Sequence, residues 1–295
     1  MLRTDLALET ARRLSLNADV EGVGQDIYED EQAQCEVADI TVTTDSAAEK
    51  LGRPCGRYIT VKSTQGPLDR FSDRFGSRAE LIAKLLRELA GGAERILVAG
   101  LGNRGLSADA VGPLCADRIF ATRHIRGLGP IGEGLTEVSV TEPGVLGRTG
   151  MESAEVIKAL CSAVEPDLLI AVDSLACLDP DHLGRTVQLC DTGISPGSGV
   201  SNHRSELSRR TLGVKVIAVG VPMVMDYPDR EDLVITPHNV DLLARNSAEY
   251  IAMGINLAFQ RELDLNDLRS LIECKITDSK GCPFRFSRLR KHQCP

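Results

Sequence analysis

Three stretches of the chain are continuously apolar after a charged first residue, and the first two end at a glycine and at a polar residue. They are 95–100, 167–173 and 215–221, and each has the length of a strand that is buried on both faces of a parallel sheet. Helical periodicity follows at 153–164 and 237–260. Strands that alternate with helices in this way predict an α/β fold, with three layers (α/β/α) around a mostly parallel sheet.

The N-terminal part has a different pattern. We expect a helix at 2–14, strands at 35–42 and 56–61, and a helix at 77–90. Ser77 is the expected N-cap of the last helix, and Gly91 ends it. The chain therefore divides into 1–75, which packs on or extends the core, a catalytic core at 76–265 and a basic tail at 266–295, with a single domain overall as the alternative.

Composition excludes several classes of protein. The net charge of -8 and the pI near 5.3 argue against a general nucleic-acid binder. None of the nine cysteines forms a CxxC pair and no HExxH motif occurs, so no zinc or thioredoxin-type site is indicated. The sequence lacks a signal peptide and a membrane-spanning apolar run, which predicts a cytoplasmic, reduced protein.

The loop at 100–105 has the formal pattern GxGxxG. A dinucleotide site would need a helix that starts within the motif and an acid about 20 residues further on, at the end of the next strand. Gly112 and Pro113 interrupt that helix, and the next expected strand, 137–140, ends near Glu142, which is too far along. The glycines instead favour a tight turn that presents the residues after them.

A GxSxG pattern at 193–197 also fails a chemical test. The residue after Ser195 is Pro196, which has no N–H to contribute to an oxyanion hole. His203 lies in a loop rich in Gly and Ser and is either a functional residue or an ordinary surface histidine.

The remaining candidates for catalytic residues are acids at the ends of expected strands. Asp109 follows the glycine loop and Asp173 ends the second apolar strand, while Asp191 and Asp226 are weaker candidates. If the first two strands are neighbours, both acids reach one crevice, where paired carboxylates differ in pKa and can activate water and protonate a leaving group without a cofactor. The alternative for each acid is a helix cap or a loop salt bridge.

Many segments, in order, resemble the germination proteases of spore-forming bacteria. They include RTDLA (3–7), GRYIT (56–60), GLGN…DAVGP (100–113), PGVLGRTGME (143–152), AVDSLA (171–176), DTGI…PGSGV (191–200), VIAVGVPM (216–223) and TPHNVD (236–241). In this resemblance Gly100, Gly102, Asn103, Ser198 and His203 are expected to support the loops or the substrate. Ser195 stands where relatives have His, and the basic tail matches nothing in the family.

The resemblance implies an endopeptidase that degrades small acid-soluble spore proteins during germination in the spore core. Asp109 and Asp173 would be its catalytic pair, with no metal or other cofactor, and the protein would be a homotetramer similar in fold to hydrogenase maturation peptidases. The family is made as a zymogen, and a segment here resembles its self-cleavage site, which implies a cut between Asp5 and Leu6 that removes five residues. The rival hypotheses are a metal-using maturation peptidase, a nucleotide-binding regulatory protein and an inactive scaffold.

Overall fold

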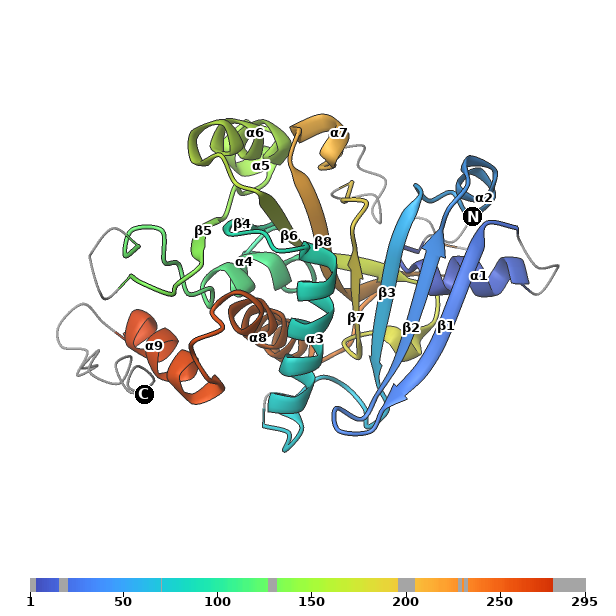
Figure 1. Cartoon of the computed structure of the whole chain (residues 1–295). Helices are drawn as coiled ribbons and strands as arrows, with labels where there is room; N and C mark the ends of the chain where they lie inside the picture. The colour runs from blue at the N-terminus through green and yellow to red at the C-terminus, as the bar shows by residue number, and fades with distance from the viewer. Residues whose placement is uncertain are drawn as a thin grey trace, which may run out of the picture.

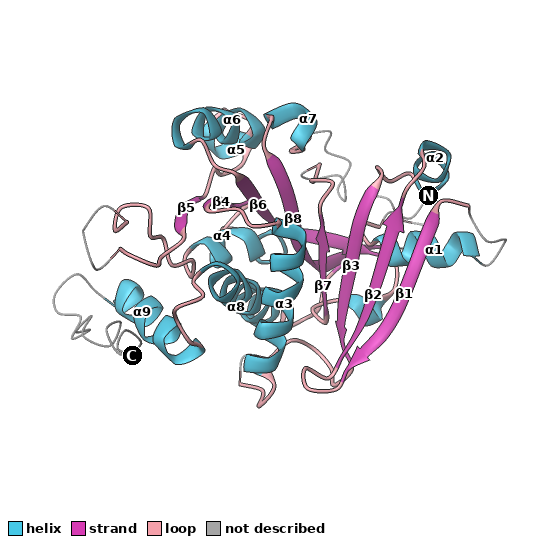
Figure 2. Ribbon diagram, viewed as in Figure 1, coloured by secondary structure: helices cyan, strands magenta, loops and turns pink. Residues whose placement is uncertain are grey.

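The structure is a computed structural model that describes residues 4–15, 21–69, 71–126, 132–195, 205–227, 230 and 233–277. Its strands are β1 (Val23–Asp30), β2 (Cys35–Val42), β3 (Gly56–Ser63), β4 (Arg95–Gly100), β5 (Glu137–Thr141), β6 (Leu168–Cys177), β7 (Thr186–Cys190), β8 (Lys215–Asp226) and β9 (Val234–Ile235). All of these described strands belong to one sheet in the order β1-β2-β3-β7-β8-β6-β4-β5, with β9 added to the end of β8 (Figures 1 and 2).

The sheet has a parallel part and an antiparallel part. β5, β4, β6 and β8 pair in parallel, whereas β7, β3, β2 and β1 continue the sheet as antiparallel strands. The predicted α/β fold is confirmed, with its parallel strands at the three apolar stretches. The N-terminal strands extend this same sheet, because β3 pairs with β7.

Helices cover both faces of the sheet (Figure 1). They are α1 (Ala7–Ser15), α2 (Asp45–Leu51), α3 (Phe75–Ala90), α4 (Val111–Ala116), α5 (Leu146–Thr149), α6 (Ser153–Val164), α7 (Arg209–Leu212), α8 (Val240–Phe259) and α9 (Leu265–Thr277). The largest core lies between the sheet and α3, α4 and α8. On the opposite face, α6 packs on β4 and β6, and α1 and α2 pack beside β2 and β3. The described part of the chain contains no helix with the length and apolar character needed to cross a membrane.

Three local predictions are corrected by the structure. α3 begins at Phe75 with Arg74 as its N-cap, so Ser77 lies inside the helix, although Gly91 does end it in the left-handed conformation. Gly112 and its neighbour Pro113 lie inside α4 and do not interrupt it, since proline is tolerated in the first turn of a helix.

The first helix starts later than the predicted 2–14. It begins at Ala7, because the residues before it form hydrogen bonds with β6 and β7 in place of a helical turn. This departure places residues 4–9, the N-terminal segment, against the sheet, beside the strand that carries Asp173.

Candidate active site

Asp109 follows β4, and Asp173 lies within the neighbouring strand β6. The prediction that Asp173 ends its strand is wrong, because β6 continues to Cys177 through its pairing with β8. β4 and β6 pair in parallel with Gly100 opposite Val172, and the Leu101 N–H donates to the Val172 carbonyl at 2.8 Å. Asp173 comes directly after Val172, and the chain that leaves Gly100 forms the loop that leads to Asp109. The strand adjacency on which the predicted acid pair depends is therefore present.

Glycines allow the loop at 100–105 to pack closely against Asp109. Gly102 has a φ of +108°, and a Cβ at this position would lie 2.2 Å from the Asp109 carbonyl oxygen. Gly100 and Gly112 are equally close-packed, since a Cβ on Gly100 would lie 2.3 Å from the Gly112 carbonyl oxygen. Side chains at these positions would push the loop away from α4, so the glycines serve close packing.

Asn103 holds the Asp109 turn through its backbone. The Asn103 N–H donates to both the carbonyl oxygen and Oδ2 of Asp109, each at 2.9 Å. Its side-chain Oδ1 accepts from the Gly105 N–H at 3.0 Å, which closes the loop on itself. Asp109 ends a short 3-10 turn that contacts β6 and β8 and is half-buried.

Arg104 fastens the same loop to the rest of the protein. Its guanidinium lies 2.6 Å from Asp117 and 2.6 Å from Glu142, and it also donates to the Pro113 carbonyl at 3.1 Å. These carboxylates raise the pKa of Arg104 above its ordinary value. No sequence pattern indicated these ion pairs, because Asp117 lies at the end of α4 and Glu142 follows β5.

Asp173 lies deeper than Asp109. It is 4% exposed, and its Oδ1 accepts from the Ser174 N–H at 2.9 Å. The two acids thus differ in environment, one buried in the sheet and the other half-buried in a turn.

A row of three residues crosses the sheet at the level of Asp173. Gly220 of β8 pairs with Asp173 of β6 on one side and with Gln188 of β7 on the other. Directly opposed residues point to the same face of a sheet, so Asp173 and Gln188 face the same side with only a glycine between them. A Cβ on Gly220 would lie 2.6 Å from the Leu175 side chain, so glycine leaves the space that Leu175 fills.

The N-terminal segment lies on this face of the sheet. The Asp5 N–H donates to the Ala176 carbonyl at 2.9 Å, and the Ala176 N–H donates to Asp5 Oδ2 at 2.8 Å. The register of β6 against β8 shifts between Leu175 and Ala176. A bulge of this kind redirects backbone groups, and the N–H of Ala176 takes an acidic side chain as its acceptor.

The bond between Asp5 and Leu6, the predicted self-cleavage site, is buried and held on both sides. Leu6 is fully buried and packs with Leu175 and Cys177. Gln188 donates from Nε2 to the Asp5 carbonyl oxygen at 2.7 Å and accepts from the Ala7 N–H at its Oε1 at 2.8 Å.

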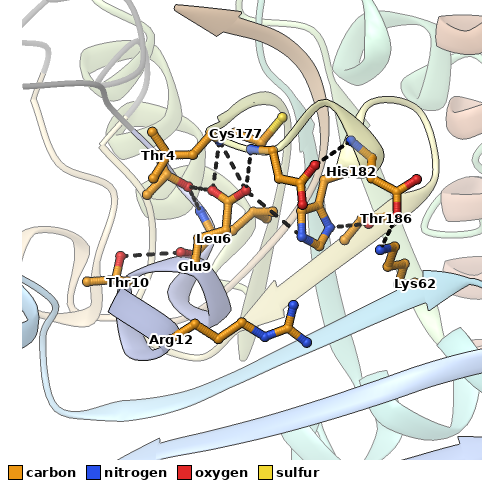
Figure 3. A network of polar contacts seen from close by, with 12 residues as sticks. Thr4, Leu6, Glu9, Thr10, Arg12, Lys62, Cys177, His182 and Thr186 are labelled. Carbon is orange, nitrogen blue, oxygen red and sulfur yellow. Dashed lines mark hydrogen bonds and ion pairs between the residues drawn. The ribbon is translucent and has the colours of Figure 1, made fainter. Parts of the chain in front are cut away.

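Glu9 anchors the far end of the segment (Figure 3). Its buried carboxylate accepts from the N–H groups of Leu178 and Asp179, each at 2.9 Å, and from the Thr4 hydroxyl. The His182 Nε2 lies 3.9 Å from Glu9, and burial holds the pKa of His182 below its ordinary value while Glu9 opposes this effect. The sequence marks Glu9 only as the last residue of the segment that resembles the self-cleavage site, and its anchoring role is not visible there because its partners lie about 170 residues away in the chain.

A cavity of about 470 Å³ adjoins the segment. Asp5, Gln188 and Gly220 line it, together with Arg53, whose guanidinium donates to the Thr4 carbonyl at 2.6 Å. Open space therefore lies beside Asp5 and its contact with Gln188.

Other predicted residues are placed elsewhere. Ser198 and His203 lie outside the described residues. Asp191 follows β7, which runs opposite to β8, and its Oδ1 accepts from the Arg57 N–H at 2.8 Å, so it lies away from the carboxyl ends of β6 and β8. Asp226 ends β8, six residues beyond Gly220, and pairs with β9.

The geometry bears on two alternative kinds of site. No helix starts within the loop at 100–105, as a dinucleotide site would require, because the next helix begins at Val111. Within the described ranges, no three His, Cys, Asp or Glu side chains are grouped so that they could hold a metal ion.

One acid on the loop after β4 and one within the adjoining strand β6, with a peptide segment docked on β6, form an arrangement suited to peptide hydrolysis. The family model for germination protease matches residues 4–229. The germination protease of Caldanaerobacter subterraneus subsp. tengcongensis is 34% identical, with 92% of this chain and 98% of the relative covered. That of Clostridium tetani is 32% identical, with 92% and 99% covered. That of Halalkalibacterium halodurans is 38% identical over 75% of this chain and 63% of the relative.

The chain therefore belongs to the germination protease family. It is a peptidase, and thus a hydrolase, with a role in spore germination. These relatives give no support to a nucleotide-binding regulatory protein. Among solved structures, a [NiFe] hydrogenase maturation protease from Thermococcus kodakarensis matches with a TM-score of 0.37 and 22% identity, over 58% of this chain and 98% of that one, which is too weak to support an inference about the site.

Proposed function

We propose that this protein is an endopeptidase that cleaves small acid-soluble spore proteins in the spore core at germination, with Asp109 and Asp173 as its catalytic pair. The observation that carries the proposal is the pairing of β4 with β6, since Asp109 lies on the loop that follows β4 and Asp173 lies in β6 one residue beyond the end of that pairing. The docked N-terminal segment adds support, because Gln188, which lies in one row with Asp173, donates to the carbonyl oxygen of its Asp5–Leu6 peptide bond.

In the proposed reaction, one carboxylate takes a proton from water while the water oxygen adds to the carbonyl carbon. The electron pair of the carbonyl double bond moves to oxygen. The tetrahedral intermediate then collapses, the carbon–nitrogen bond breaks, and the other carboxyl group gives its proton to the leaving amine. Proton exchange between the two carboxyl groups restores the starting state, and the net change is the addition of one water across the peptide bond.

The same chemistry would remove the N-terminal segment by a cut between Asp5 and Leu6. Support comes from the contacts around this bond: Asp5 pairs with Ala176, and Leu6 is buried beside Leu175. The segment would be held as a substrate is held, with its acidic side chain on a backbone N–H and its apolar side chain in a pocket. We include in the proposal that the protein assembles as a homotetramer.

The acid pair is tested by the variants Asp109→Asn and Asp173→Asn. Each removes one proton acceptor or donor with little change of volume, and cleavage of a purified small acid-soluble spore protein should fall by about 10²-fold or more in each. Asp191→Asn is the matched control and should cleave at the wild-type rate. Wild-type rates in both acid variants would refute the proposal.

A further inference from the structure

Gln188 is a buried polar residue on β7 with 6% of its surface exposed. Its side-chain amide forms two hydrogen bonds with the N-terminal segment, one to the Asp5 carbonyl oxygen and one from the Ala7 N–H. These two groups flank the Asp5–Leu6 bond. A strand residue that lies about 180 positions away in sequence therefore holds this particular bond.

A primary amide satisfies both groups at once, whatever the pH. The carbonyl oxygen of Asp5 needs a donor and the Ala7 N–H needs an acceptor, and Gln supplies both from one planar group. An ionised Glu would offer acceptors alone, and Met would offer no donor. The two partners also identify the amide atoms, with Nε2 toward the Asp5 carbonyl oxygen and Oε1 toward the Ala7 N–H.

The donated hydrogen bond reaches the atom on which negative charge develops during hydrolysis. Donors that are held in place toward such an oxygen stabilise the transition state more than the ground state. The position of Gln188 in the sheet fits this role, because Gly220 joins it to Asp173 in one row on one face. Two strand spacings, about 10 Å, separate the two backbones, and the Leu175 side chain lies over the glycine between them.

We propose that Gln188 is a catalytic residue for self-processing, which positions the Asp5–Leu6 bond through both amide groups and stabilises the oxyanion that forms on the Asp5 carbonyl. This inference rests on the proposed function, namely that the acid pair cuts this bond. It assigns a role to a residue that neither motif nor strand pattern singled out.

The test compares three variants of the full chain: Gln188→Met, Gln188→Glu and Gln25→Met as the control on the exposed strand β1. Self-processing is followed by mass spectrometry as the appearance of a chain that begins at Leu6. At pH 7 we expect a fall of about 10²-fold in both Gln188 variants, the usual effect of removing one oxyanion donor. Gln25→Met should process at the wild-type rate.

A pH series separates this role from a purely structural one. When the carboxyl group introduced by Gln188→Glu is protonated, it regains one donor and keeps one acceptor, so the rate of this variant relative to wild type should rise about tenfold or more between pH 7 and about pH 4.5. The ratio for Gln188→Met should stay constant. The other ionisable groups that line the cavity, Tyr58, Cys190, Arg53, Asp5 and Glu206, are present in every variant and cancel in the ratio.

The outcomes distinguish the two proposals. If the wild-type chain is never cut after Asp5, the proposed self-processing fails, whatever Gln188 does. If wild type is cut and Gln188→Met is cut as fast, the role of Gln188 is overturned alone. If both Gln188 variants are slow but the rate of Gln188→Glu relative to wild type does not rise at low pH, Gln188 is structural and the catalytic role is likewise overturned. Urea unfolding midpoints of the variants report any loss of folding.

Discussion

Replacement of Gly102 by Ala should strongly reduce activity while the protein still folds. Its φ of +108° is strained for any other residue, and a Cβ there would lie 2.2 Å from the Asp109 carbonyl oxygen and 3.0 Å from Oδ1. In Gly102→Ala, the strained backbone costs about 1 to 3 kcal/mol. The Asp109 turn must also move by about 1 Å to reach an ordinary contact, and a shift of this size can cost about 10²-fold in rate.

The assay measures two quantities for Gly102→Ala, the free energy of unfolding in urea and the rate of cleavage of a spore protein. We expect a loss of about 2 kcal/mol and a rate that falls by about 10²-fold, because Asp109 is displaced while the sheet survives. Gly105→Ala is the matched control in the same loop, since its nearest contact would be 3.4 Å from the Asn103 side chain. Wild-type activity in Gly102→Ala would refute the link between this turn and the chemistry.

The remaining predictions concern the N-terminal segment and the absence of a metal. Glu9→Ala removes a buried carboxylate that accepts from the N–H groups of Leu178 and Asp179 and should lower the free energy of unfolding by about 3 kcal/mol, while Glu29→Ala on the exposed strand β1 changes it by less than about 0.5 kcal/mol. Because the pKa of His182 is lowered in the folded state, the protonated form is disfavoured there. The contribution of neutral His182 to the free energy of unfolding should therefore be fully present above about pH 6.5. It should fall as the pH drops below this value, by at most about 1.4 kcal/mol per pH unit. Urea unfolding at about pH 7 and pH 5 should show a smaller fall for His182→Gln than for wild type. Treatment with a chelator followed by dialysis should leave the cleavage rate unchanged, and a loss that added zinc or nickel restores would favour a metal-using peptidase.

The strands that the sequence revealed are those whose burial is continuous. β4, β6 and β8 lie between two layers of helices, so nearly every residue in them is apolar and the pattern is unambiguous. β7 was not predicted, because its five buried residues include Thr186 and Gln188, whose polar groups find partners only in the folded chain. The exposed residues of β1 likewise give no apolar signal at the edge of the sheet.

The candidate site was accessible from the sequence only in part. Asp109 and Asp173 were candidates together with Asp191 and Asp226, and only the family resemblance selected the pair. The adjacency of their strands required the order of strands in the sheet. The row through Gly220 and the pairing of Asp5 with Ala176 depend on register and on a bulge, which a single sequence does not encode in any local pattern. Such contacts join residues that are far apart in the chain, so only the fold brings them together.

The most direct test of the acid pair is a mass spectrum of the products when the protein is mixed with a purified small acid-soluble spore protein. Wild type should yield peptides cut between an acidic and an apolar residue, together with its own chain beginning at Leu6. The double variant Asp109→Asn with Asp173→Asn should yield neither. The same peptides from the double variant, at the same rate, would contradict the account.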